Sequence, residues 1–417
     1  MIAHVAIWTI CAASIGGVLV RPKGLPEWVW ASGGAALLAL FGLLSLRVVT
    51  AAVARGSEVY LFLTGMMLLS ELARHEGVFD WVAVHAVRAA AGSRYRLFVL
   101  VYAVGIAVTT VLSNDATAVV LTPAVAAAVR KAKAEPLPYL FACAFIANAA
   151  SFVLPISNPA NLVVFAGAIP TLPHWLAAFA LPSLIAIGAT FAVLALVSRR
   201  DLRGAITGPI ESTKLGAGGR VALGGIATTA VVLLVTSALG APLGTMTCGC
   251  GVAALAIACL RERAACAAVL GAVSWTVLLL VAGLFVLVSG LDATGLLNET
   301  QHGAEILLTW PPAFSLLGAA GVTAAASNVM NNLPAGLIAG SSVATLSGHQ
   351  AFRAAVAIGI DLGPNLSVTG SLATVLWLIA LRREQIAVDT WTFLRVGALV
   401  MPPALVLAVL GILVTVK

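Results

Sequence analysis

Four polar stretches rich in Gly, Pro and Asn interrupt long apolar runs of the chain, and they hold most of the residues that could do chemistry. They cover residues 113–117, 155–161, 327–334 and 361–371. Backbone groups at membrane depth must be satisfied within the protein, so such breaks are tolerated only where they line a cavity or pack in protein. Each break is therefore predicted to form part of a binding site.

The breaks offer amides, hydroxyls and helix ends, and they contain no Lys or Arg. Pro155 and Pro159 remove backbone donors and stop a helix, which frees carbonyls and neighbouring amides for a polar solute. This set suits an uncharged hydroxylated solute, whereas an organic anion would favour cationic partners. The predicted substrate-binding residues are Ser113, Asn114, Asn148, Ser157, Asn158, Asn161, Ser327, Asn328, Asn331, Asn332, Thr369 and Ser371.

Two carboxylates lie in the breaks, Asp115 in the first half of the chain and Asp361 in the second. A carboxylate in this setting can cap the N-terminal N–H groups of a helix. Transporters also build ion sites from half-helix ends and carboxylates near the bilayer midplane. We therefore predict proton coupling at Asp115 and Asp361, with Asp115 as the principal carrier. Glu71 and Asp292 are interpreted as interfacial residues.

Enzyme chemistry is not indicated. The chain has no phosphate-binding Gly-Lys loop and no Cys/His metal spacing, so we predict no catalytic residues, no metal and no cofactor. Its six cysteines lie in apolar segments and are interpreted as small buried hydrophobes, without disulfides. The alternative is that Cys248 and Cys250 contact a soft metalloid. Uphill transport must be driven by an ion gradient or by a partner.

The composition is that of a protein embedded in the lipid bilayer. Hydrophobic residues make up 61% of the chain and charged residues 9%, whereas soluble domains carry roughly 25% charged residues. The net charge of +7 is scattered over short loops, which argues against nucleic acid as a partner. We predict an all-α fold with ten spans near 3–20, 28–46, 58–74, 139–168, 175–197, 220–239, 243–260, 272–290, 351–380 and 392–414, and two hairpins near 96–130 and 311–346.

The distribution of Lys and Arg predicts the orientation. With the N-terminus outside, only Arg47, Arg55, Arg353 and Lys417 fall on the outer face, as the positive-inside rule favours. The predicted loop 291–310 contains three acidic residues and no Lys or Arg, which suits that face. The C-terminus is also predicted outside.

A polar segment at 199–219 divides the chain into halves at 1–198 and 220–417 and is interpreted as a cytoplasmic linker. Five spans plus one hairpin per half predict two inverted repeats whose broken helices meet at the midplane. Sequence matches support the repeat: Gly65 and Gly77 match Gly283 and Gly295, Ser113-Asn114 matches Ser327-Asn328, and 148–158 matches 361–371.

The hairpins leave one alternative open. Basic residues flank both ends of 96–130, so its polar tip at 113–117 would point into the membrane as a re-entrant hairpin. The same residues could instead form two full spans joined by a short external Ser-Asn-Asp turn.

The motifs at the four breaks resemble the ArsB arsenite permease family, part of the ion transporter superfamily. The resemblance covers the whole chain in its span pattern. It is carried by 113–117 with Thr122-Pro123, by Ser327-Asn328 with 330–334, and by 361–364 with 370–377. Two positions depart from the family pattern: Asn365 stands where relatives usually have Lys, and Val368 where they usually have Pro. If that Lys neutralises the carboxylate in relatives, Asp361 lacks this partner.

The resemblance implies export of trivalent arsenic and antimony hydroxides (arsenite and antimonite) across the bacterial inner membrane, driven by protons and sometimes assisted by a soluble arsenite-stimulated ATPase. A sodium/proton antiporter using the same carboxylates is the alternative function. A membrane scaffold or receptor is a third class, which paired helix breaks with midplane carboxylates do not favour.

Overall fold

The computed structural model describes residues 2–165, 169–208, 214–344, 346 and 348–416. Over these residues the secondary structure is helical, apart from one isolated bridge between Ser93 and Ala205. Eight helices are long and apolar enough to cross a membrane, or nine if the bent pair α3–α4 forms one span. The predicted all-α membrane fold is confirmed.

The helices occur in the same order in both halves of the chain. The first half runs α1 (Ile2–Val20), α2 (Glu27–Leu40), α3 (Leu46–Arg55), α4 (Ser57–His75), α5 (Val78–Ala89), α6 (Arg94–Val111), α7 (Asn114–Ala116), α8 (Thr122–Lys131), α9 (Leu137–Ala149), α10 (Pro159–Val164) and α11 (Leu172–Val197). The second runs α12 (Ala217–Ala238), α13 (Leu243–Arg261), α14 (Arg263–Ala272), α15 (Thr276–Asp292), α16 (Leu296–Leu308), α17 (Pro312–Met330), α18 (Asn332–Val343), α19 (Gln350–Leu362), α20 (Leu372–Arg383) and α21 (Thr390–Thr415).

The two halves also share local features at equivalent positions. A glycine with positive φ stands before α5 and again before α16, namely Gly77 (φ 70°) and Gly295 (φ 90°), and each redirects the chain where a side chain would be strained. The last helix of each half, α11 and α21, has 26 residues and contains proline. Short turns, η1 (Pro22–Gly24), η2 (Thr117–Leu121), η3 (Pro155–Ser157) and η4 (Gly363–Asn365), complete the path.

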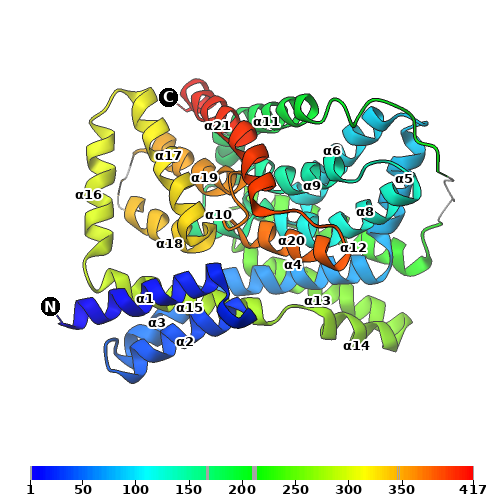
Figure 1. Ribbon diagram of the computed structural model, residues 1–417. Helices are drawn as coiled ribbons and strands as arrows, with labels where there is room; N and C mark the ends of the chain where they lie inside the picture. The colour runs from blue at the N-terminus through cyan, green and yellow to red at the C-terminus, as the bar shows by residue number, and fades with distance from the viewer. Residues whose placement is uncertain (1, 166–168, 209–213, 345, 347, 417) are drawn as a thin grey trace.

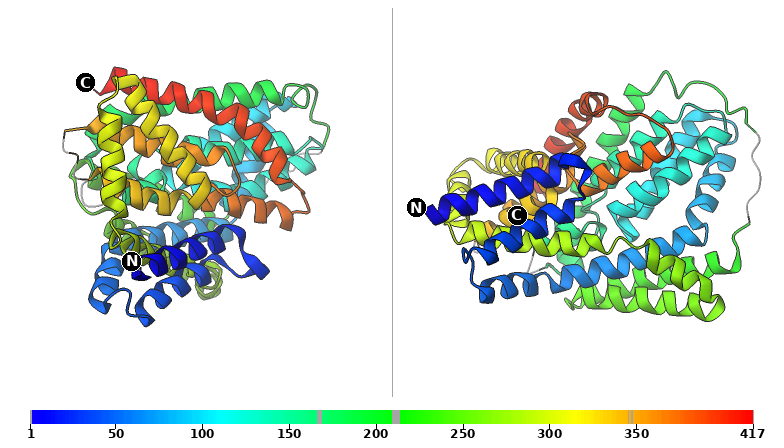
Figure 2. Two further views of the ribbon diagram at one scale, coloured as in Figure 1. Left: turned by 60° about the vertical axis from the view of Figure 1, so that its left-hand side comes forward. Right: turned by 60° about the horizontal axis from the view of Figure 1, so that its bottom comes forward.

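The helices form two layers (Figure 1). We call α1–α4 with α12–α15 the frame, and α6–α11 with α17–α21 the core. Helices α5 and α16 stand at opposite ends of the molecule and connect the layers. The halves exchange partners, because α2 packs on α15, α4 on α13, and α11 on α21. Figure 2 shows α11 and α21 side by side on the far side of the core from the frame.

The contact between α4 and α13 is close because glycines form it. A Cβ on Gly65 would lie 2.2 Å from the carbonyl oxygen of Thr247, and one on Gly251 would lie 2.6 Å from the carbonyl oxygen of Gly65. Small residues let helix backbones approach closely within a membrane. The frame is therefore fixed at this crossing.

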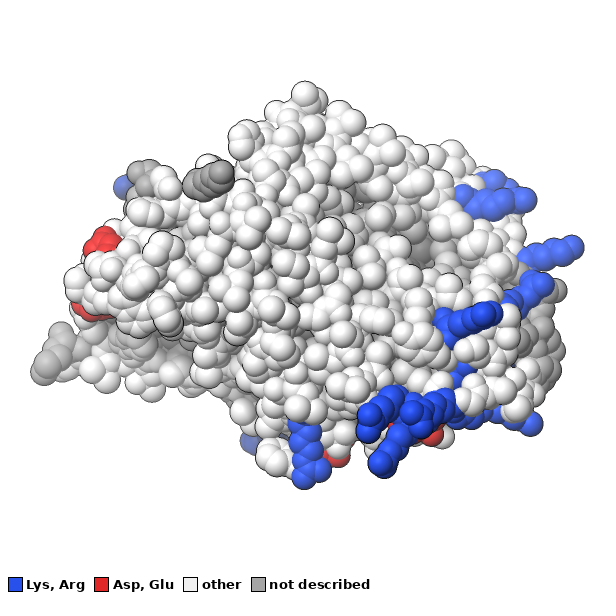
Figure 3. All heavy atoms as spheres, turned by 90° about the horizontal axis from the view of Figure 1, so that it is seen from above, with Lys and Arg blue, Asp and Glu red and all other residues white. Residues whose placement is uncertain are grey.

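The basic loops gather at one end of the molecule, and acidic side chains show at the other (Figure 3). Hydrogen bonds tie these loops together: the Arg94 amide donates to the Gly204 carbonyl, and the Gly208 amide donates to the Ala132 carbonyl. The start of α6 and the end of α8 therefore share one face.

The end of α20 reaches this face too, where Arg130 donates to the Glu384 carbonyl. With 12 residues, α20 spans about 18 Å, and its first residue, Leu372, lines the same cavity as Asp115 at the tip of the first hairpin. The length of α20 is roughly half of a bilayer's hydrocarbon core, whereas α6 and α17, the first arms of the two hairpins, are each long and apolar enough to cross it.

Several predicted elements differ from the structure. The span predicted over 28–46 ends at Leu40, because Gly42 turns the chain with φ 64°. The spans predicted over 139–168 and 351–380 are each two short helices with an irregular break, as their prolines and glycines require. The predicted loop 291–310 is mostly the amphipathic helix α16, and α12 begins inside the predicted linker.

One prediction about cysteine is wrong: Cys259 and Cys266 form a disulfide, although no disulfide was expected. They lie near the junction of α13 and α14, where the chain turns back on itself and brings them together. Residues 166–168, 209–213, 345 and 417, which fall in a predicted span, the linker, a hairpin and the C-terminus, lie outside the described residues.

Candidate functional site

Each of the four predicted breaks is followed by a helix whose first N–H groups are capped by a predicted site residue. The side chain of Ser113 accepts from the Ala116 amide at 3.2 Å, and that of Asn158 from the Ala160 amide at 3.0 Å. In the second half Asn331 and Ser371 cap α18 and α20 in the same way. Helix N-termini carry positive partial charge, so these ends attract oxygen atoms of a ligand without a cationic side chain.

The two halves meet at a hydrogen bond between Asn158 and Asp361. The Asn158 amide donates to Asp361 Oδ1 at 2.7 Å, and both side chains are buried. The second carboxylate oxygen, Oδ2, is also buried and makes no hydrogen bond to the described residues. Because an unpartnered buried oxygen is costly, a proton, water or solute hydroxyl is the natural partner for this atom.

A second network joins α9 to the break before α20. The Asn148 amide donates to Asn365 Oδ1 at 3.0 Å, and its oxygen accepts from Ser371 at 3.4 Å. Asn365 in turn donates to the Phe145 carbonyl at 3.1 Å. Thr374 completes the group through Ser371 at 2.8 Å. Asn365 thus binds α9, while Asn158 holds Asp361.

The tip of the second hairpin packs on the break after α19. Asn328 donates to the Gly363 carbonyl at 2.9 Å and accepts from Ser367 at 2.5 Å. The Thr369 hydroxyl donates to the backbone carbonyl of Asn328 at 3.1 Å, and the backbone N–H of Asn332 donates to the Gly370 carbonyl at 2.9 Å. These bonds fix the tip in its position over the break.

The tip of the first hairpin opens onto a cavity instead. Asp115 and Ser113 line a cavity of about 100 Å³ together with Glu71 of α4, Pro159 of α10 and Leu372 of α20. The cavity therefore lies between frame and core. At roughly 30 Å³ per molecule in the liquid, this volume holds a few waters or one small solute.

The remaining predicted residues support the site without facing this cavity. Ser157 donates to the Thr110 carbonyl at 3.2 Å, which ties the second break to the first hairpin. Asn161 donates to the Ser151 carbonyl at 2.8 Å, and Ser327 donates to the Thr323 carbonyl at 2.9 Å. Asn114 is buried at the start of α7. Asp115 and Asp361 do not contact one another.

The sequence interpretation missed four residues of the site: Glu71, Asn365, Ser367 and Thr374. Three of them lie in or next to the fourth break, where Asn and Thr could have been included on residue type alone. The sequence predicts Glu71 to be an interfacial residue, and in the structure it accepts a hydrogen bond from Arg74 at 2.6 Å. Its place on the cavity with Asp115 follows only from packing.

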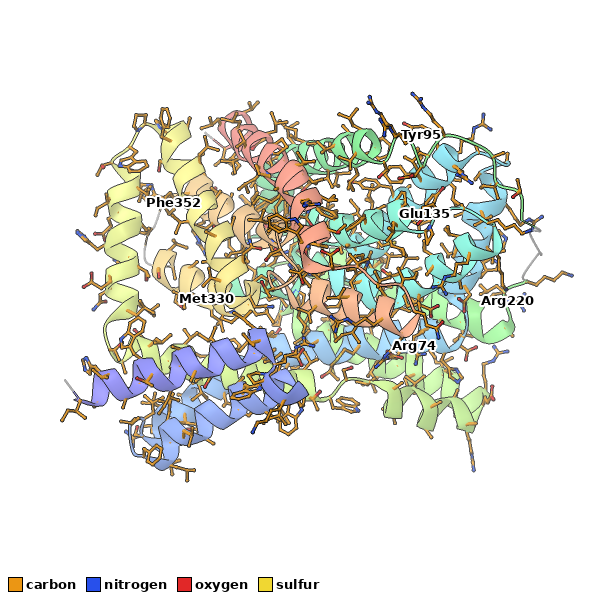
Figure 4. The ribbon with its side chains drawn as sticks, in the orientation of Figure 1. Arg74, Tyr95, Glu135, Arg220, Met330 and Phe352 are labelled. Atoms are coloured by element: carbon orange, nitrogen blue, oxygen red, sulfur yellow. A yellow bond between two sulfur atoms is a disulfide. The ribbon has the colours of Figure 1, made fainter. Side chains whose placement is uncertain are left out.

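Three other cavities among the described residues border the core, and one of them, about 480 Å³, lies between α10 and the frame beside Arg55 and Glu58. A very small one lies under Asn331 and is lined by Arg21, which forms an ion pair with Glu27. A larger one, about 720 Å³, is almost wholly apolar and lies among α1, α16, α17, α18 and α19. Met330 and Phe352, which line it, are on the side of the core that faces α16 (Figure 4).

Known proteins are similar to this chain in sequence and in fold. The chain is 29% identical to the arsenical pump membrane protein of Escherichia coli K12 over 408 residues, covering 93% of both chains. It is also 29% identical to that of Yersinia enterocolitica, with 82% of each covered. The crystal structure of the YdaH transporter of Alcanivorax borkumensis, described as having an unusual topology, matches 88% of this chain and 86% of its own with a TM-score of 0.53 at 15% identity.

A family profile matches over most of the chain as well. The profile of the CitMHS family, described as citrate transporter, covers residues 7–360 and thus includes three of the four breaks. The chain therefore belongs to the citrate transporter (CitMHS) family, and it is an ArsB-like membrane transporter.

Proposed function

We propose that this chain exports trivalent arsenic and antimony hydroxides from the cytoplasm by proton antiport. One observation carries the proposal: the breaks of the core hold four capped helix N-termini, buried amides and two carboxylates, and the first of them lines a cavity between frame and core. The described residues that line the Asp115 cavity include no Lys or Arg. The similarity to arsenical pump membrane proteins supports the same cargo.

The chemistry of the cargo agrees with these residues. Trivalent arsenic hydroxide is uncharged near neutral pH and offers three hydroxyl groups, which match amide oxygens, amide N–H groups and helix ends. A citrate-like anion would need uncompensated positive charge. Arg21, which lines a very small cavity together with Asn331 of the second hairpin, is already paired with Glu27.

We further propose that 1–198 and 220–417 are inverted repeats with N- and C-termini outside. The shared helix order and the exchange of partners between α2, α15, α4 and α13 support this arrangement. The basic loops tied together through 201–208 would then face the cytoplasm. A proton taken up at Asp115 or Asp361 would bias the core between inward- and outward-facing states.

Transport into everted membrane vesicles tests the proposal. With an imposed proton gradient that is acidic inside the vesicles and no ATP, vesicles that contain the protein should accumulate arsenite as protons leave, and a protonophore should abolish the accumulation. Proton movement stimulated by sodium but not by arsenite would instead identify a sodium/proton antiporter. Accumulation only after adding a soluble ATPase with ATP would reject proton antiport.

A further inference from the structure

The corner between α13 and α14 brings two cysteines together outside the site described above. Cys259 lies in the last turns of α13 and Cys266 at the start of α14, with a Cα–Cα distance of 5.1 Å. Glu262, the residue between the helices, is extended (φ −145°, ψ 106°) and makes the turn that apposes them. Both cysteines are half-buried.

The other cysteines are not arranged in this way. Cys11 is buried in the frame and Cys143 in the core, and Cys248 and Cys250 are unpaired in α13. Among the described residues, Cys259 and Cys266 are thus the pair whose sulfur atoms can bind one common atom.

The position of the corner determines its redox state in the cell. Arg261 and Arg263 flank it, and α14 lies toward the end of the molecule where the basic side chains gather (Figures 1 and 3). With that end in the cytoplasm, the glutathione and thioredoxin systems keep cysteines reduced. Thiolate sulfur is the form of cysteine that binds soft elements.

We propose that the reduced Cys259–Cys266 pair is a dithiol binding site for trivalent arsenic or antimony. Two cytosolic thiol groups first reduce the disulfide to two cysteine thiols and are themselves oxidised to one disulfide. Arsenic hydroxide then exchanges two hydroxyl groups for two sulfur atoms: two As–S bonds form, two As–O bonds break, and the thiol protons leave in two waters. Arsenic stays trivalent throughout.

This site is distinct from the translocation site. It belongs to the frame, where α14 packs on α4, whereas the amide-rich breaks belong to the core. Two sulfur atoms hold trivalent arsenic more tightly than amides and hydroxyls do, so exchange at the dithiol is slower than transport requires. The choice of ligand rests on the proposed function, but binding can be measured without transport.

The test uses the full-length protein in detergent, reduced with a phosphine and desalted under nitrogen. After addition of phenylarsine oxide, which needs two thiols for stable binding, and a second gel filtration, arsenic is measured by mass spectrometry. We expect roughly one arsenic atom per chain, at least tenfold less in Cys259→Ala and in Cys266→Ala, and no loss in the matched control Cys248→Ala/Cys250→Ala. Oxidised protein should bind none until it is reduced.

Folding and transport are monitored separately, so that each result is informative. Each variant must elute as the same monodisperse species as wild type; otherwise the Cys→Ser variant at that position replaces it. Full arsenic binding by a folded Cys259→Ala/Cys266→Ala variant overturns the proposal. Binding by a protein that moves no arsenite in vesicles keeps this site and rejects the transport function.

Discussion

Asn158 and Asp361, 203 residues apart and on different halves of the chain, share a hydrogen bond of 2.7 Å at the centre of the molecule. It joins the break before α10 to the end of α19, two elements of the core. Since Asp361 keeps one buried oxygen without a partner, this bond holds the carboxylate in place while leaving an atom available for a proton.

Asp361→Asn should uncouple transport from the proton gradient. An amide keeps an oxygen that accepts from Asn158, so the site retains its shape, but it cannot take up a proton. We expect proton-driven arsenite accumulation to fall at least tenfold, which corresponds to a loss of more than about 1.4 kcal/mol in the coupled step. Exchange of labelled for unlabelled arsenite should persist. Loss of both activities together would mean that Asp361 binds substrate rather than protons.

Asp115→Asn and Glu71→Gln test the cavity that these two carboxylates share. Asp115 is the predicted carrier, so its substitution should abolish coupled transport. Glu71 lies on the same cavity and beside Arg74, so its substitution should slow transport several-fold by impeding proton transfer toward the cytoplasm. Asp80→Asn, an exposed carboxylate on α5, is the matched control and should transport like wild type.

Asn148→Ala should destabilise the protein. The substitution leaves Asn365 and Ser371 with buried polar atoms that lose their partner, at a cost of about 1–3 kcal/mol. Thermal unfolding in detergent, followed by tryptophan fluorescence, should show a midpoint several degrees lower. Asn298→Ala removes an exposed amide on α16 and should leave the midpoint unchanged, and equal midpoints for both variants would refute the network.

Gly251→Ala should disrupt the crossing of α4 and α13. Its new Cβ would lie 2.6 Å from the carbonyl oxygen of Gly65, which is backbone and cannot move alone, and overpacking of this kind costs about 1–3 kcal/mol. Gly249→Ala, two residues earlier on the same helix, meets nothing within 4 Å. We expect the unfolding midpoint to drop for Gly251→Ala and to stay or rise for Gly249→Ala.

Reporter fusions test the proposed orientation. Alkaline phosphatase, which is active only outside the cytoplasm, should be active when fused after residue 416 and inactive when fused after Arg203. Green fluorescent protein should give the opposite pattern. The expectation rests on the basic loops that gather around 201–208, and the reverse result at both positions would invert the topology.

The breaks could be predicted from sequence because polar residues and prolines inside apolar runs have few physical explanations. The helix caps at these breaks can be predicted as well, because Ser113 and Ser371 precede helices and use the ordinary capping geometry. The hydrogen-bond partners of the site residues cannot be predicted from the sequence. Asn148 binds Asn365 and Asn158 binds Asp361 only because the two halves exchange helices, and no local pattern records that exchange.

Amphipathic helices are the other part of the fold that the sequence pattern does not predict. Helices α5 and α16 contain no apolar run long enough to span a bilayer, so the apolar runs of the sequence do not predict them. Glu71 pairs with Arg74 near the end of α4, which is typical of interfacial residues and does not by itself indicate a place in the site. Its role depends on which hairpin tip packs opposite α4, and sequence spacing does not specify this.

The partner exchange in the frame and the pairing of α11 with α21 mean that neither half is a self-sufficient folding unit. A polypeptide that stops before α12 would leave α2, α4 and α11 without the helices they pack on. During synthesis, the first half must therefore wait in the bilayer, incompletely packed, until the second is inserted. Two separately expressed halves should consequently complement each other, while either one alone is a substrate for membrane proteases.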